Sequence, residues 1–133
     1  NYLIKYLRSD LPMAPKGKEG AKELIRSLRR GVSIGLVIDQ KMNDGIKVPF
    51  FNKPAMTSDA LAQLCLKIKT LVIPVEVERL KKTTFKITFH EPINININNR
   101  KKSKLEIMSE VNLIIEKWIR KNPGQWLWLH RRW

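Results

Sequence analysis

Apolar residues recur at helical spacing in three stretches of the chain. In the first stretch Ala21, Leu24, Ile25 and Leu28 fall on one face, with charged residues on the other side. The spacing predicts helices over residues 19–30, 58–69 and 105–121. Thr57 or Ser58 precedes the second helix as an N-cap. We therefore expect three amphipathic helices.

Other stretches have the composition of strands. Residues 33–38 and 71–77 are nearly all apolar and rich in β-branched side chains, which is typical of strands buried on both faces. Residues 84–90 alternate as in a half-exposed strand, and antiparallel pairing with 71–77 through 79–82 follows. Residues 46–51 form a further extended piece. The order of helices and strands predicts an α/β fold with a mixed sheet flanked by helices.

Length and composition favour one domain spanning residues 1–133. The chain begins with Asn1 and shows no leader or cleavage pattern, so we expect an internal fragment. No apolar run approaches the roughly 20 residues of a membrane-spanning helix. The single cysteine, Cys65, lies among apolar residues and is expected to be a small core side chain.

The charge is strongly positive, with 26 Lys and Arg against 12 Asp and Glu and a formal net charge of +14. Such a field favours an anionic partner: nucleic acid, phospholipid headgroups, phosphorylated small molecules or an acidic carrier protein. A solvated basic surface is the simpler interpretation, also for the basic run at residues 100–104. Composition alone does not separate these classes.

No complete catalytic motif is present. The two histidines are His90 and His130, and the residue five positions beyond His90 is Ile95 rather than an acid. The chain contains no Gly-x-Ser-x-Gly elbow, no phosphate-binding Gly-x-x-x-x-Gly-Lys and no clustered metal ligands. We expect no metal or cofactor, and we interpret His130 as a core histidine.

Four blocks, in order, carry a resemblance to a known family. They are Gly31 to Gln40 ending in Asp-Gln, Ile46 to Phe51 with Pro54 to Thr57, Leu71 to Val75 with its Ile-Pro pair, and Gln125 to Trp133 (Gln-Trp-Leu-Trp-Leu-His-Arg-Arg-Trp). Together they resemble the lipid A biosynthesis acyltransferases, the lauroyl and myristoyl transferases of the glycerolipid acyltransferase superfamily. Asn52 stands where that family's pattern has glycine.

The resemblance implies the C-terminal part of an enzyme of the cytoplasmic face of a Gram-negative inner membrane. Such an enzyme transfers a fatty acyl chain from an acyl carrier protein or coenzyme A thioester to a hydroxyl of a lipid A precursor in lipopolysaccharide biosynthesis. The family's His-x4-Asp/Glu motif and N-terminal anchor are absent, so we expect no catalytic residue here and an inactive fragment. We expect a monomer that contacts the membrane surface and no nucleic acid. The alternative is a basic module that binds nucleic acid or anionic lipid without catalysis.

Candidate substrate-binding residues follow from position. Asp39 and Gln40 come just after a buried strand, where ligands bind in open α/β sheets, although an ordinary polar pair at a strand end has the same pattern. Thr57 is either a substrate ligand or, more simply, a helix N-cap. Arg79 follows a strand and could reach a phosphate through its planar guanidinium, with a solvated or ion-paired arginine as the alternative.

The C-terminal block and the Phe-Phe pair complete the candidate site. Arg131 and Arg132 lie among tryptophans and are expected to bind phosphate or to dock the C-terminal segment. Phe50 and Phe51 are expected to line an acyl-chain groove, with core packing an equal alternative. We expect positions 39, 40 and 79 to share one concave surface.

Overall fold

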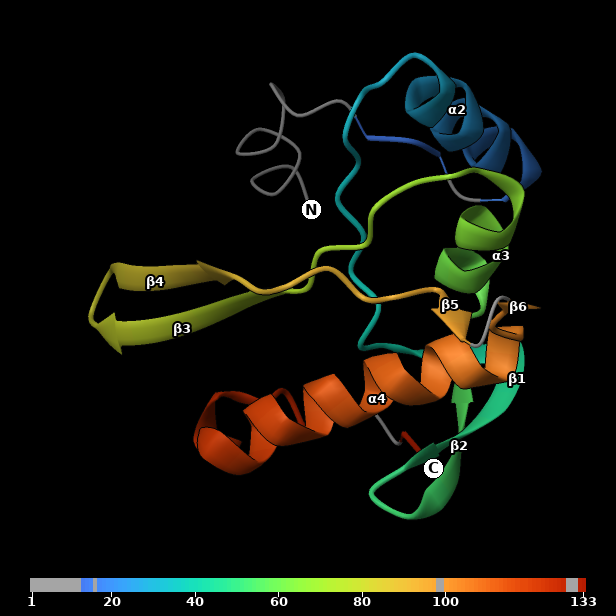
Figure 1. The fold of residues 1–133 in the computed structure, drawn as a ribbon. Helices are drawn as coiled ribbons and strands as arrows, with labels where there is room; N and C mark the ends of the chain where they lie inside the picture. The colour runs from blue at the N-terminus through green and yellow to red at the C-terminus, as the bar shows by residue number, and fades with distance from the viewer. Residues whose placement is uncertain (1–12, 16, 98–99, 129–131) are drawn as a thin grey trace. The chain divides into compact units, whose positions relative to one another are not determined.

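A computed structural model describes residues 13–15, 17–97, 100–128 and 132–133 (Figure 1). The chain divides into two compact units, Asn1–Gly35 and Leu36–Trp133. The α/β class is confirmed, and the described strands pair as three separate two-stranded antiparallel sheets rather than one mixed sheet. Among the described residues no helix is both long enough and apolar enough to span a bilayer.

The described part of the first unit is built around helix α2, Lys18–Arg29. The predicted helix over 19–30 is thus confirmed to within one residue. Gly31 has a φ of 77°, the left-handed conformation in which glycine commonly ends a helix. Gly20 lies so close to the carbonyl of Pro15 that a Cβ there would stand 1.6 Å from its oxygen.

The predicted strand over 33–38 is wrong, because residues 32–39 form no strand. A strand needs a partner to satisfy its backbone groups, and no described strand pairs with this segment. The alternation of a strand nevertheless survives in the part that belongs to the second unit. Leu36 and Ile38 pack against the core, and Val37 is exposed.

The second unit begins with a hairpin of β1, Lys41–Phe50, and β2, Lys53–Thr57. The extended piece predicted at 46–51 lies within it. Phe50 pairs with Lys53, so two residues make the turn, and both have positive φ: 49° at Phe51 and 60° at Asn52. Such values are typical of the type I′ turns that fit the twist of a hairpin.

Two helices cover this hairpin, α3, Ala60–Lys67, and α4, Lys104–Lys121. Their inward faces meet the buried strand residues in one core, which also contains Cys65, as predicted. Ser103 and Glu106 form a capping box at the start of α4, and the short 3-10 helix η1, Pro123–Gln125, follows its end. The N-cap of α3 is Asp59, so the capping role expected for Thr57 is wrong.

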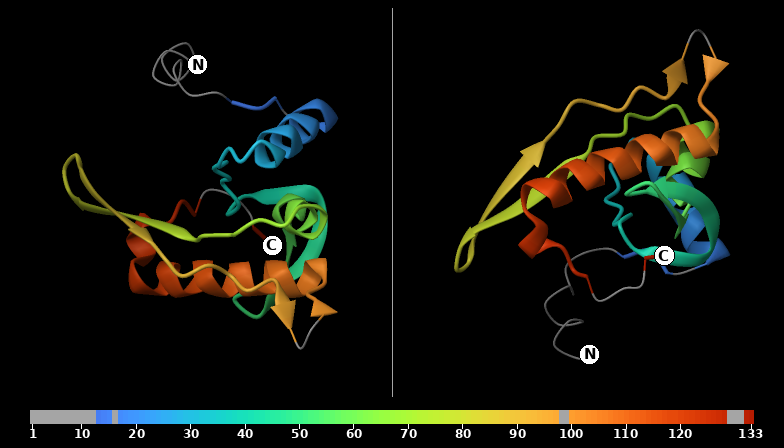
Figure 2. Two further views of the ribbon diagram at one scale, coloured as in Figure 1. Left: turned by 45° about the horizontal axis from the view of Figure 1, so that its top comes forward. Right: turned by 90° about the horizontal axis from the view of Figure 1, so that it is seen from below.

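A second hairpin joins β3, Val75–Lys81, and β4, Thr84–Phe89, and its antiparallel pairing was predicted correctly. Figures 1 and 2 show the hairpin extending away from α3. The buried strand predicted over 71–77 is wrong in two respects: pairing starts only at Val75, and Leu71, Ile73, Val75 and Val77 are exposed. The third pair, β5 (Asn96–Ile97) and β6 (Arg100–Lys101), is short.

Candidate functional site

The C-terminal Arg132 closes onto the β1–β2 hairpin. Its side chain is 3% exposed, and its guanidinium donates to the backbone carbonyl of Met56 and, over 3.1 Å, to the hydroxyl of Thr57. It also lies 5.2 Å from the centroid of the Phe50 ring. Thr57 is fully buried at the end of β2, and its hydroxyl donates to the carbonyl of Ala55. The described hydrogen bonds of the Arg132 and Thr57 side chains are therefore all made to other residues of the chain.

Asp39 provides a negative charge to Arg132. Burial lowers the pKa of Arg132, and the charge of Asp39 opposes that shift. Asp39 itself is half-buried, and its Oδ1 has no hydrogen-bond partner among the described residues; the same holds for Nε of Arg132. Neighbouring Gln40 is exposed. The two residues therefore combine a carboxylate near a buried cation with an amide open to solvent.

Phe50 and Phe51 are held by different parts of the chain, Phe50 by the C-terminal Trp133 and Phe51 by helix α4. Trp133 donates its indole N–H to the carbonyl of Phe50 over 3.0 Å and stacks on that ring at a centroid distance of 5.7 Å. The N–H of Phe51 donates to a carboxylate oxygen of Glu116 over 2.7 Å, and the guanidinium of Arg120 lies 4.8 Å from its ring centroid. Phe50 is buried in the core, which favours the packing interpretation, whereas Phe51 is partly exposed.

Arg79 lies elsewhere, on β3. Its guanidinium is 5.1 Å from the ring centroid of Phe85, and its backbone exchanges hydrogen bonds with the side chain of Gln125 at 2.8 and 3.1 Å. No described contact links Arg79 with Asp39 or Gln40, and the concave surface expected to be shared by the three positions stays a prediction. Arg131 and His130 lie outside the described residues.

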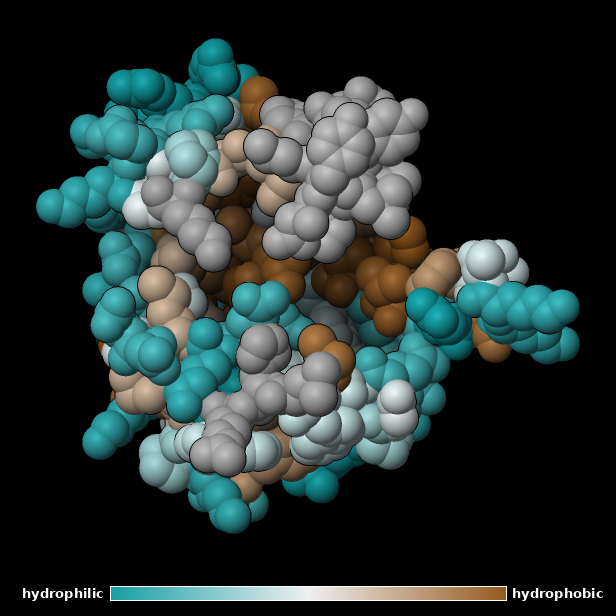
Figure 3. Space-filling model, turned by 180° about the vertical axis from the view of Figure 1, so that it is seen from behind, coloured by the Kyte–Doolittle hydropathy of each residue, from teal (hydrophilic) through white to brown (hydrophobic). Residues whose placement is uncertain are grey.

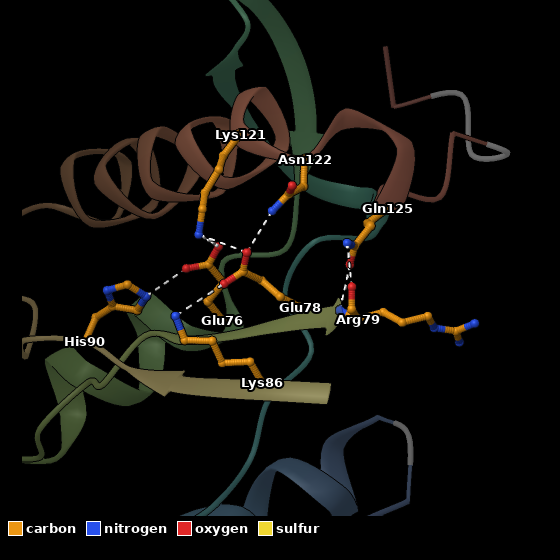
Figure 4. A network of polar contacts seen from close by, with 8 residues as sticks. All are labelled: Glu76, Glu78, Arg79, Lys86, His90, Lys121, Asn122 and Gln125. Carbon is orange, nitrogen blue, oxygen red and sulfur yellow. Dashed lines mark hydrogen bonds and ion pairs between the residues drawn. The ribbon is translucent and has the colours of Figure 1, made fainter. Parts of the chain in front are cut away.

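A polar network beside Arg79 was not anticipated from the sequence (Figure 4). Lys121 of α4 reaches Glu76 over 3.4 Å and Glu78 over 2.9 Å, and Asn122 donates to Glu78 over 2.9 Å. His90 lies 3.2 Å from Glu76. Ion pairing with Lys121 lowers the pKa of Glu78 and raises that of Lys121. The network attaches the β3–β4 hairpin to the end of α4.

Two polar residues on the inner face of α4 were also missed. Asn112 is fully buried and donates to the carbonyl of Pro49 over 2.8 Å, and Glu116 holds the turn at Phe51. The pattern contained a signal for both, since they interrupt an otherwise apolar helix face with groups that need a partner when buried. Within the described ranges no group of three or more His, Cys, Asp or Glu side chains could hold a metal ion.

Fold and site together define an α/β protein in which the C-terminal residues Arg132 and Trp133 pack on the β1–β2 hairpin. The half-buried carboxylate of Asp39 acts on the buried guanidinium of Arg132. The chain belongs to the bacterial lipid A biosynthesis acyltransferase family, whose model matches residues 3–133. The resemblance inferred from the four sequence blocks is thereby confirmed, together with acyl transfer in lipid A biosynthesis as the general activity. No curated protein sequence matches the chain.

Proposed function

We propose that this chain is the C-terminal part of an acyltransferase domain that moves a fatty acyl chain from a thioester donor to a hydroxyl of a lipid A precursor. The observation that carries the proposal is the family match over residues 3–133 in a chain whose His90 is followed five positions later by Ile95 rather than by an acid. The scaffold and the general activity are those of the family, and the proton acceptor must come from elsewhere.

The reaction needs one general base. A histidine supplied by the region N-terminal to this chain, in a His-x4-Asp/Glu motif, takes the proton of the acceptor hydroxyl as its oxygen attacks the thioester carbonyl. The carbon–sulfur bond then breaks, and the thiol of acyl carrier protein or coenzyme A leaves with the proton returned by the histidine. An ester to the lipid A precursor results.

The residues of this chain divide into ligands and supports. Gln40 is exposed and Asp39 is half-buried beside it, so these two contact the substrate or the incoming histidine. Arg132 and Thr57 are buried and bonded to each other, and they act by holding the end of β2 in place. Phe51, partly exposed at the turn, contacts the acyl chain, and Phe50 supports it from the core.

The arginines outside this cluster serve the anionic ends of the substrates. Arg131 belongs to the same C-terminal block as Arg132 and binds a phosphate of the acceptor or of the donor's phosphopantetheine arm. Arg79, on the β3–β4 hairpin, binds another of these phosphates. The enzyme works as a monomer at the cytoplasmic face of the inner membrane, and a formal charge of +14 suits that anionic surface.

The proposal is tested by comparing two polypeptides, the 133 residues alone and the same residues preceded by their native upstream sequence. Each is incubated with an acyl thioester and a lipid A precursor, and the acylated lipid is measured by mass spectrometry. We expect product only with the longer polypeptide, and none when its motif histidine is replaced by alanine. Product from the 133 residues alone would refute the division of roles proposed here.

A further inference from the structure

The β3–β4 hairpin presents an apolar face that the rest of its unit leaves uncovered. Residues directly opposite each other in an antiparallel pair share a face. The pairs Val75 with Phe89, Val77 with Ile87 and Arg79 with Phe85 therefore lie on one side. All five apolar members of this set are exposed, with Phe89 at 72%, Ile87 at 59% and Val77 at 58%.

The opposite face of the hairpin determines this orientation. Glu76 and Glu78 point toward the end of α4 and are held by Lys121, Asn122 and His90 (Figure 4). Turning the apolar face inward would break the contacts that hold the nearly buried Glu76, and Glu78 beside it, against the end of α4. The apolar face is therefore kept outward by specific contacts.

The charge around this face has one sign. Arg79, Lys81 and Lys82 lie toward the tip of the hairpin, and its acidic residues, Glu76 and Glu78 of β3, lie on the other side. Figure 3 shows hydrophobic residues gathered along the inner part of the hairpin and hydrophilic residues at its tip. The basic run at residues 100–104 differs, because its Arg100, Lys102 and Lys104 are each ion-paired within the chain.

We propose that this face, defined by Val75, Val77, Phe85, Ile87 and Phe89, lies on an anionic lipid bilayer, with Arg79, Lys81 and Lys82 at the phosphates. An apolar surface bordered by cations matches the boundary between acyl chains and headgroups. The five side chains expose roughly 500 Å², if a fully exposed Val, Ile or Phe presents about 150–200 Å². A stable dimer buries about 800 Å² on each partner, so a second copy is the poorer match.

The experiment measures co-sedimentation of the chain with vesicles of phosphatidylglycerol and, separately, of phosphatidylcholine. We expect binding to phosphatidylglycerol that weakens as salt rises, and much weaker binding to phosphatidylcholine. The double variant I87S/F89S is expected to lower the partition coefficient at least about tenfold, because both side chains lose apolar contact. K81Q and K82Q should each lower it about fivefold, the effect of one cation near a charged surface.

The matched control is Leu113→Ser on α4, where a similarly exposed leucine (63%) stands outside the face. It should bind phosphatidylglycerol as the unaltered chain does, and circular dichroism should show that all variants fold. The proposal is overturned if the chain does not bind these vesicles, if I87S/F89S binds them unchanged, or if that variant instead abolishes self-association. Because sedimentation requires no acyl transfer, it is independent of the reaction proposed above.

Discussion

Replacing Arg132 with methionine tests whether the C-terminal residues hold the β1–β2 hairpin. Methionine retains much of the side-chain volume but removes the guanidinium that bonds the carbonyl of Met56 and the hydroxyl of Thr57. It also leaves the half-buried Asp39 without its counter-charge. The substitution therefore isolates the polar and ionic part of the contact.

The expected loss follows from the burial of these groups. Two hydrogen bonds from a charged donor are worth about 1.5–3 kcal/mol each. Part of this is returned, because the variant no longer buries a guanidinium, whose desolvation is the main cause of the lowered pKa of Arg132. The net reduction in the free energy of unfolding is then about 3 kcal/mol. Arg120→Met is the control, since that side chain is 64% exposed and should cost no more than about 1 kcal/mol.

The assay is urea denaturation followed by tryptophan fluorescence, which reports on Trp133 where it stacks on Phe50. A double-mutant cycle of Arg132→Met with Asp39→Asn should give a coupling energy of about 1 kcal/mol or more if the two charges interact. If Arg132→Met and Arg120→Met destabilise equally, the C-terminal residue does not hold the hairpin and the reasoning fails.

Four further predictions concern single positions. The pKa of Glu106 is lowered to about 2, chiefly by its hydrogen bond with Arg100. The stabilisation that the Glu106 carboxylate provides should therefore be complete above pH 4.5 and disappear as the pH falls toward 2. Acid unfolding of E106Q and of the unaltered chain, followed by circular dichroism, measures this loss. Burial raises the pKa of the Cys65 thiol, and we expect slow reaction with a thiol reagent until urea unfolds the chain. A Cβ at residue 45 would stand 2.1 Å from a backbone oxygen, so Gly45→Ala should destabilise by about 1–3 kcal/mol in urea. At the φ of 60° of Asn52, Asn52→Gly should be neutral or stabilising and Asn52→Val should cost about 1 kcal/mol or more, measured by thermal unfolding.

Local periodicity was sufficient to predict the helices and the second hairpin. The helix over 105–121 was predicted almost to the residue, because a continuous apolar stripe and the Asn122-Pro123-Gly124 stop both lie in the local sequence. The pairing of β3 with β4 also needed only neighbouring residues. By contrast, a strand over 33–38 needs a neighbouring strand to pair with, and the local sequence does not show whether one is present.

The candidate site was predictable in its members but not in their roles. Asp39, Thr57 and Arg132 were all predicted as site residues from the sequence. In the structure Arg132 bonds Thr57, and the charge of Asp39 acts on Arg132. The burial of Arg132 favours the second of its two expected roles, docking of the C-terminal segment, because its guanidinium bonds the hairpin. Thr57 carries the usual signature of an N-cap, yet it ends strand β2. This role was not predictable, because the local sequence does not show that Arg132, 75 positions away, bonds its hydroxyl.

We propose that Asp39 and Gln40 line the acyl-transfer site of a lipid A acyltransferase. It is tested most directly by measuring kcat/KM for acyl transfer in the polypeptide that carries the upstream region, with Asp39→Asn and Gln40→Ala beside the exposed control Lys69→Ala. We expect kcat/KM of the two site variants to fall about tenfold or more, the value of one hydrogen bond to a charged or reacting group, and that of the control to be unchanged. Equal rates for all three variants would contradict it.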